Sequence, residues 1–120
     1  MHTPGLTKNF VADGDLEKYS FAAAGEDDGT AAQAAGATAP ILGVTTIVGA
    51  ADGERVDVIL DGIAYVTAGG TIAYGAQVTA NSAGKAVTAS TGHSAGIALE
   101  AATADDVIPV LITRGFVAAE

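Results

Sequence analysis

The chain contains no cysteine and no tryptophan, and its only aromatic residues are three Phe and three Tyr. Without cysteine it can form neither a disulfide nor a thiolate metal site, and the redox state of its compartment cannot be read. Alanine and glycine, with 27 and 16 copies, fill many of its 120 positions. Because hydrophobic stabilisation scales with buried apolar area, we expect a thin core that binding partners supplement.

Basic residues are also scarce: five Lys and Arg stand against 14 Asp and Glu, giving a formal net charge of −9. Nucleic-acid binding needs clustered basic side chains to replace counterions, so this balance excludes it as the expected function, and it also argues against an anionic membrane surface. No apolar run reaches the roughly 18–20 residues that span a bilayer. The N-terminus lacks a basic-then-apolar signal pattern, which predicts a protein made and used without export.

The sequence changes character near residue 40. Residues 1–39 show little periodicity and contain acidic turns and an Ala-rich run. We interpret them as an extended N-terminal arm with one or two short strands. Residues 40–120 are predicted to form a β domain.

Short β-branched and apolar segments, separated by turn residues, recur throughout residues 40–120. Arg55–Leu60 alternates apolar and charged side chains, which is typical of a half-buried strand. Asp61-Gly62 indicates a tight turn or a glycine bulge in one bent strand, and Pro109 favours an edge position or a bulge. The fold class is therefore mostly β, a small sandwich or barrel-like domain. The expected strands are Ile41–Val48, Arg55–Leu60, Ile63–Thr67, Thr71–Thr79, Lys85–Ser90, Ala95–Leu99 and Val107–Thr113.

The segment Gly92-His93-Ser94-Ala95-Gly96 matches the G-x-S-x-G nucleophile elbow of α/β-hydrolases. That chemistry needs a strand–turn–helix context and a separate histidine base. His93 is adjacent to Ser94 and cannot easily turn back to its hydroxyl, and the other histidine is His2. We interpret the motif as a turn before a strand and expect no catalytic residues.

The acidic turn Glu26-Asp27-Asp28-Gly29 could suggest calcium, but its acids are consecutive and no bidentate Glu follows at EF-hand spacing. We expect a solvated turn, no metal site and no cofactor. A carrier domain would need a lysine at a hairpin tip. Lys85 follows such a turn but lacks the usual flanking residues, so unmodified Lys85 is expected.

Several segments, in order, resemble the capsid decoration (cement) proteins of tailed bacteriophages, a family that includes lambda-type head decoration proteins. No one segment is specific; their order and combined length carry the resemblance. They are Lys8–Asp15, Pro40–Val44, Glu54–Val66, Ala68–Ile72, Gly75–Thr79, Gly84–Val87, Ala95–Glu100 and Val107–Val110.

The resemblance implies a compact β domain of the β-tulip type and no enzymatic activity. It implies a structural protein, made in the host cytoplasm, that sits on the outer surface of the virion capsid. There it would bind the major capsid protein at three-fold and quasi-three-fold sites, often as a homotrimer, and stabilise the expanded shell. The alternative is a head-fibre or adhesin-base module of the virion.

The arm is the expected capsid-binding element, because extended segments can add a strand to a partner. In this hypothesis the arm is mobile alone and its large side chains enter capsid pockets. The other interpretation is that it completes the protein's own sheet or that of a neighbouring copy. The candidate capsid-binding residues are Lys8, Asn9, Phe10, Val11, Asp13, Tyr19 and Phe21.

Overall fold

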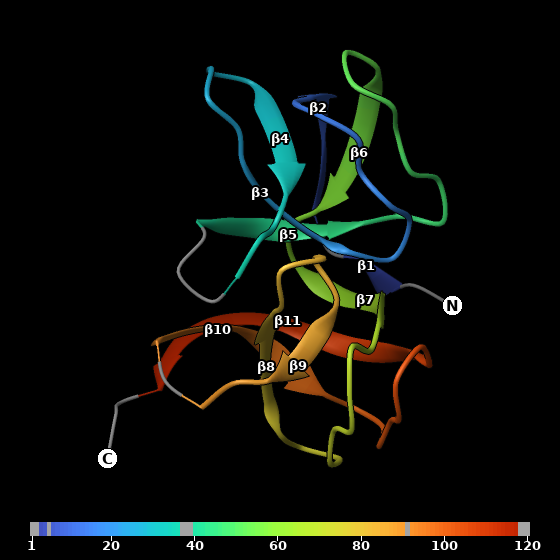
Figure 1. The fold of residues 1–120 in the computed structure, drawn as a ribbon, viewed down its shortest axis with the longest axis vertical. Helices are drawn as coiled ribbons and strands as arrows, with labels where there is room; N and C mark the ends of the chain where they lie inside the picture. The colour runs from blue at the N-terminus through green and yellow to red at the C-terminus, as the bar shows by residue number, and fades with distance from the viewer. Residues whose placement is uncertain (1–2, 5, 37–39, 91, 118–120) are drawn as a thin grey trace.

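The computed structural model describes residues 3–4, 6–36, 40–90 and 92–117. Regular structure in these ranges consists of β-strands, which form a closed barrel and a second, six-stranded sheet (Figure 1). This architecture confirms the mostly β, barrel-like fold class. Over the same ranges, no helix has the length and apolar character to cross a membrane.

The barrel is built from the first half of the chain. Its strand order is β2-β4-β3-β5-β6. Neighbouring strands run antiparallel except β2 and β4, which pair in parallel through Val11 and Ala12. The strands are β2 (Thr7–Ala12), β3 (Phe21–Ala24), β4 (Thr30–Gln33), β5 (Ile41–Thr45) and β6 (Arg55–Ile59).

The second sheet has the order β1-β7-β11-β10-β8-β9. A parallel bridge between Ala68 and Ala86 brings β9 back to the end of β7, and the amide of Gly69 donates to the Ala86 carbonyl at 2.7 Å. The sheet therefore curls around its inner side chains and is convex outside. Its strands are β1 (Thr3–Pro4), β7 (Gly62–Thr67), β8 (Gln77–Ala80), β9 (Ala86–Thr88), β10 (Gly92–Ala98) and β11 (Val107–Val117).

Side-chain alternation in β6 shows how the sequence specifies the barrel. Val56 and Val58 are buried, whereas Arg55 and Asp57 are exposed, as the period-two pattern predicts. Asp61-Gly62 then carries the chain from the barrel into the second sheet. Gly62 has a φ of +91°, a conformation that glycine adopts without steric cost.

Phe21 connects the two sheets. Its side chain is fully buried in a cluster that includes Val44 and Ile59 of the barrel and Val66 and Val110 of the second sheet. Most other members of that cluster are Ala, Val or Ile. A second cluster fills the barrel interior and contains Phe10, Ala12, Leu16, Ala22, Ala31, Val56 and Val58.

Hydrogen bonds close the junction around Phe21. Its amide donates to the Gly84 carbonyl at 2.8 Å, and Gln33 Nε2 donates to the Ala83 carbonyl at 2.6 Å. The Tyr19 carbonyl accepts from the Thr67 amide at 2.8 Å, and Tyr19 has a φ of +52°. Non-glycine residues rarely adopt this left-handed conformation, so the junction holds Tyr19 in a locally unfavourable geometry.

The extended arm expected over residues 1–39 is not supported. Described residues of that segment form β2, β3 and β4, three of the five barrel strands. Phe21 is fully buried and Phe10 is 8% exposed. Small Ala side chains at the β3–β4 pairing let strands form where the sequence has no apolar alternation, so periodicity gave no signal there.

Two strand predictions also need correction. Residues 71–76 make only an isolated bridge, between Ile72 and Ala102, and the strand begins at Gln77. Pro109 lies in β11 between β7 and β10 and not at an edge. Because β10 ends at Ala98, the missing amide of Pro109 faces no strand partner there, while its carbonyl accepts from the Leu99 amide at 3.0 Å.

Replacing Phe21 with alanine should strongly destabilise both sheets, because the cavity would open at their junction. Large-to-small changes of this kind cost about 3–5 kcal/mol. Tyr74→Ala is the control, since Tyr74 is 74% exposed. Urea unfolding should show the large loss only for Phe21→Ala; equal stabilities of the two variants would contradict the shared core.

Deleting residues 1–20 should prevent folding, because the truncation removes β2 and the buried side chains of Phe10 and Leu16. The loss would leave one edge of β6 without its partner. Circular dichroism and thermal melting of the truncated protein measure the outcome. A cooperative β-rich fold after truncation would show that the rest of the chain folds without residues 1–20.

Candidate functional site

The residues that the sequence suggested for capsid binding do not form one surface cluster in the structure. Lys8 and Asn9 are exposed on β2, and the Lys8 Nζ lies 5.0 Å from the centre of the Phe10 ring. Asn9 joins a surface network, donating to Asp57 at 3.0 Å and accepting from Arg55 at 3.1 Å. The remaining candidates contribute to the fold itself. Phe10 and Phe21 are buried, Val11 and Tyr19 are partly buried, and Asp13 caps a turn.

The G-x-S-x-G segment does not have elbow geometry. Ser94 lies within β10, opposite Gly115 of β11, and is 6% exposed. The chain continues as a strand through Gly96 to Ala98, where an elbow needs a helix. The serine therefore lies in a paired strand at a register shift, so the turn predicted for this segment is wrong, and the serine is not a presented nucleophile.

Carboxylates stabilise the loops at one end of the barrel. The Gly14 amide donates to Asp52 at 2.9 Å, and the Asp52 amide donates to Asp15 at 3.0 Å. Asp13 accepts from the Glu26 amide at 3.0 Å. These bonds tie together the loops that follow β2, β3 and β5. We call the partly or fully exposed acids of this region the acidic loop surface: Asp13, Asp15, Glu17, Glu26, Asp27, Asp28, Asp52 and Glu54.

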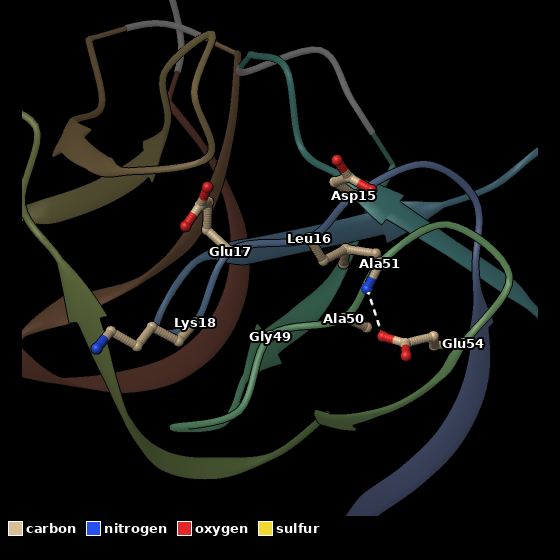
Figure 2. A pocket seen from close by; sticks show the side chains of 8 residues that line it. All are labelled: Asp15, Leu16, Glu17, Lys18, Gly49, Ala50, Ala51 and Glu54. Carbon is tan, nitrogen blue, oxygen red and sulfur yellow. Dashed lines mark hydrogen bonds between the residues drawn. The ribbon is translucent and has the colours of Figure 1, made fainter.

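A shallow pocket opens between two of these loops (Figure 2). Leu16 and Ala50 form its floor by exchanging backbone hydrogen bonds at 2.8 and 2.9 Å. Glu54 turns toward the Ala51 amide, which donates to it at 2.8 Å. A Cβ on Gly49 would lie 2.4 Å from the Leu16 carbonyl oxygen, so the close approach of the loops requires glycine there.

The acidic loop surface has no arrangement for metal binding. Among the described residues, no three His, Asp or Glu side chains gather closely enough to hold an ion. Calcium requires six to eight convergent oxygens, whereas Asp13, Asp15, Asp52 and Glu54 each turn an oxygen to a backbone amide. Their role is to hold the loops.

Much of the outer side of the second sheet over β7, β11 and β10 is apolar, with Thr67 and Gln77 at its border. Leu111 of β11 stands directly opposite Ile63 of β7 and Ile97 of β10, forming one row across three strands. Tyr65 faces Pro109 in the next row, and the Leu99 amide bonds to the Pro109 carbonyl. We call this surface the apolar outer face; it comprises Ile63, Tyr65, Ile97, Leu99, Val107, Pro109 and Leu111.

All the side chains of the apolar outer face are uncharged and at least partly exposed; Val107 is 41% and Leu111 is 39% exposed. Large contiguous apolar surfaces on soluble domains mark interaction sites. Sequence reasoning missed this face. The signal was available in β11, where apolar residues occupy both faces of a strand from Val107 to Ile112.

The fold and its surfaces define a small β protein with one acidic end and one apolar side. Residues 5–114 match the family model described as phage cement protein. The chain belongs to the phage cement protein family and is a head-associated structural protein of a bacteriophage virion.

A solved structure has the same fold: the head fiber gp8.5 N base of bacteriophage phi29, with a TM-score of 0.71 and 22% identity. The match covers 90% of this chain and 93% of that one. No curated protein sequence matches the chain.

Gly49→Ala should destabilise the protein by about 1–3 kcal/mol, because the new methyl group would collide with backbone of the opposite loop. Gly70→Ala is the matched control, since a Cβ there meets nothing within 4 Å. Thermal melting should separate the variants. Equal midpoints would show that the loops can move apart without cost.

Proposed function

We propose that the protein binds the outer surface of the icosahedral phage head at three-fold and quasi-three-fold sites and stabilises the expanded capsid. Its partner is the major capsid protein, and three copies assemble around each site. Membership of the phage cement protein family over residues 5–114 is the observation that carries this proposal.

The composition and net charge of the chain support a role in stabilising the capsid shell. A domain whose core relies on Ala and Val buries little area per residue, so binding to a lattice adds stability that the isolated domain lacks. The net charge of −9 favours solubility before assembly and repels other copies in free solution. The domain then gains stabilising contacts only where shell subunits provide a complementary site.

A base for a head fibre is the second candidate function. The likeness to the phi29 head fiber base favours it. In that role the domain would attach to the head and carry a further segment or partner outward. Images of decorated capsids would distinguish the two functions. A fibre base projects additional density from each copy, whereas a cement protein leaves a compact domain on the shell.

Purified protein should co-sediment with expanded empty capsids of its phage and bind unexpanded precursor shells much more weakly. Decorated expanded capsids should also withstand higher temperature than bare ones, since ligands that bind the assembled state stabilise it by mass action. Differential scanning calorimetry of capsids with and without added protein measures this shift. Absence of binding to expanded shells would contradict the proposal.

A further inference from the structure

We propose that the apolar outer face, on β7, β11 and β10, is the surface by which the protein docks onto an apolar groove of the major capsid protein. This inference rests on the proposed function and specifies which side of the molecule meets the shell. It also implies that the loop between β3 and β4, which lies at the end of the barrel away from the second sheet (Figure 1), remains in solvent on the decorated head.

The chemistry of the face suits burial against a protein. Leu111, Ile63 and Ile97 are cross-strand neighbours, so their side chains form a continuous surface and not scattered contacts. None of the seven side chains carries a charge, so docking avoids the desolvation penalty that buried ionic groups impose. Interface cores are similarly depleted of charged residues.

The backbone beneath the apolar outer face is held in place by strand pairing, which also favours docking. β11 lies between β7 and β10, so paired strands support the row through Leu111 on both sides. Val110, next in sequence, is fully buried in the main core. The face is therefore preorganised, and docking does not have to order a loop, which lowers the entropic cost of binding.

The acidic loop surface is a poor docking surface by the same criteria. Its carboxylates would have to lose water on binding, and the described part of the chain places few bases near them. Asp13, Asp15 and Asp52 already hold the loops by accepting backbone hydrogen bonds. Displacing them toward a partner would weaken the protein's own barrel.

A second copy fits the apolar outer face less well than the shell does. The sheet curls toward itself through the Ala68–Ala86 bridge, so we infer that its outer side is convex. Two convex surfaces touch over a small area, whereas stable interfaces bury roughly 800 Å² on each partner. A concave groove between shell subunits would contact the convex face over a larger area.

The test introduces a carboxylate into the face by the substitutions Leu111→Asp and Val107→Asp. Each should weaken binding to expanded capsids by at least about tenfold, because the new charge would be buried without a partner. Ile47→Asp is the control, since Ile47 is an equally large apolar residue that is 62% exposed in the loop after β5. The control should bind like the wild type.

Circular dichroism and thermal melting of each variant establish that it is folded before binding is measured. If an aspartate variant fails to fold, the threonine variant at the same position, Leu111→Thr or Val107→Thr, is tested instead, because threonine is compatible with a strand. It should show a smaller loss of capsid binding. Raising the salt concentration to about 0.5 M, where surface charges are screened, should not weaken wild-type binding.

The outcomes separate this inference from the proposed function. If the wild type does not bind expanded capsids, the proposed function fails. If it binds and the folded face variants bind equally well, the docking surface is wrong while the function stands. If the face variants change the oligomeric state in analytical ultracentrifugation and leave capsid affinity unchanged, the face joins copies of the protein, which also overturns the inference.

Discussion

The burial of Phe21 between the barrel and the second sheet is the interaction on which the architecture depends. Its side chain is surrounded by residues from both sheets, and most of these are small. A chain so rich in Ala and Gly buries little apolar area per residue, so we expect neither sheet to be stable without the other. Phe21 joins the two sheets through one shared cluster, beside the separate cluster of the barrel interior. Hydrogen bonds made by the Tyr19 carbonyl, the Phe21 amide and the Gln33 side chain cross the junction and fix the relative position of the sheets.

That arrangement also explains the two contrasting surfaces. The barrel end is made of long loops, and loops rich in Asp and Gly are held by carboxylates that accept backbone amides. The second sheet curls with its inner side turned to the shared core, so apolar residues left on its outer side remain accessible. The chain thus has a charged end that favours water and an uncharged side that favours a partner.

The sequence predicts the second half of the chain better than the first. Arg55–Leu60 alternates clearly, and β6 follows it closely. Residues 21–33 are mostly Ala with Gly and acids, so neither helical nor strand periodicity distinguishes them, and only pairing with β5 and β2 makes them strands. Phe10 and Phe21 were predicted to anchor an extended arm in capsid pockets, whereas both are buried within the protein itself. They lie in two different clusters, which no local pattern could reveal, because each cluster depends on contacts with residues far along the chain.

The apolar outer face depends on the same long-range information, since its rows appear only once β7, β10 and β11 are aligned. The most direct measurement is a cryo-electron microscopy reconstruction of expanded capsids decorated with this protein. The account predicts that Leu111 and Val107 are buried against the major capsid protein and that Glu26 to Asp28 face outward into solvent. A reconstruction with the acidic loop surface against the shell and the apolar outer face in solvent would contradict it.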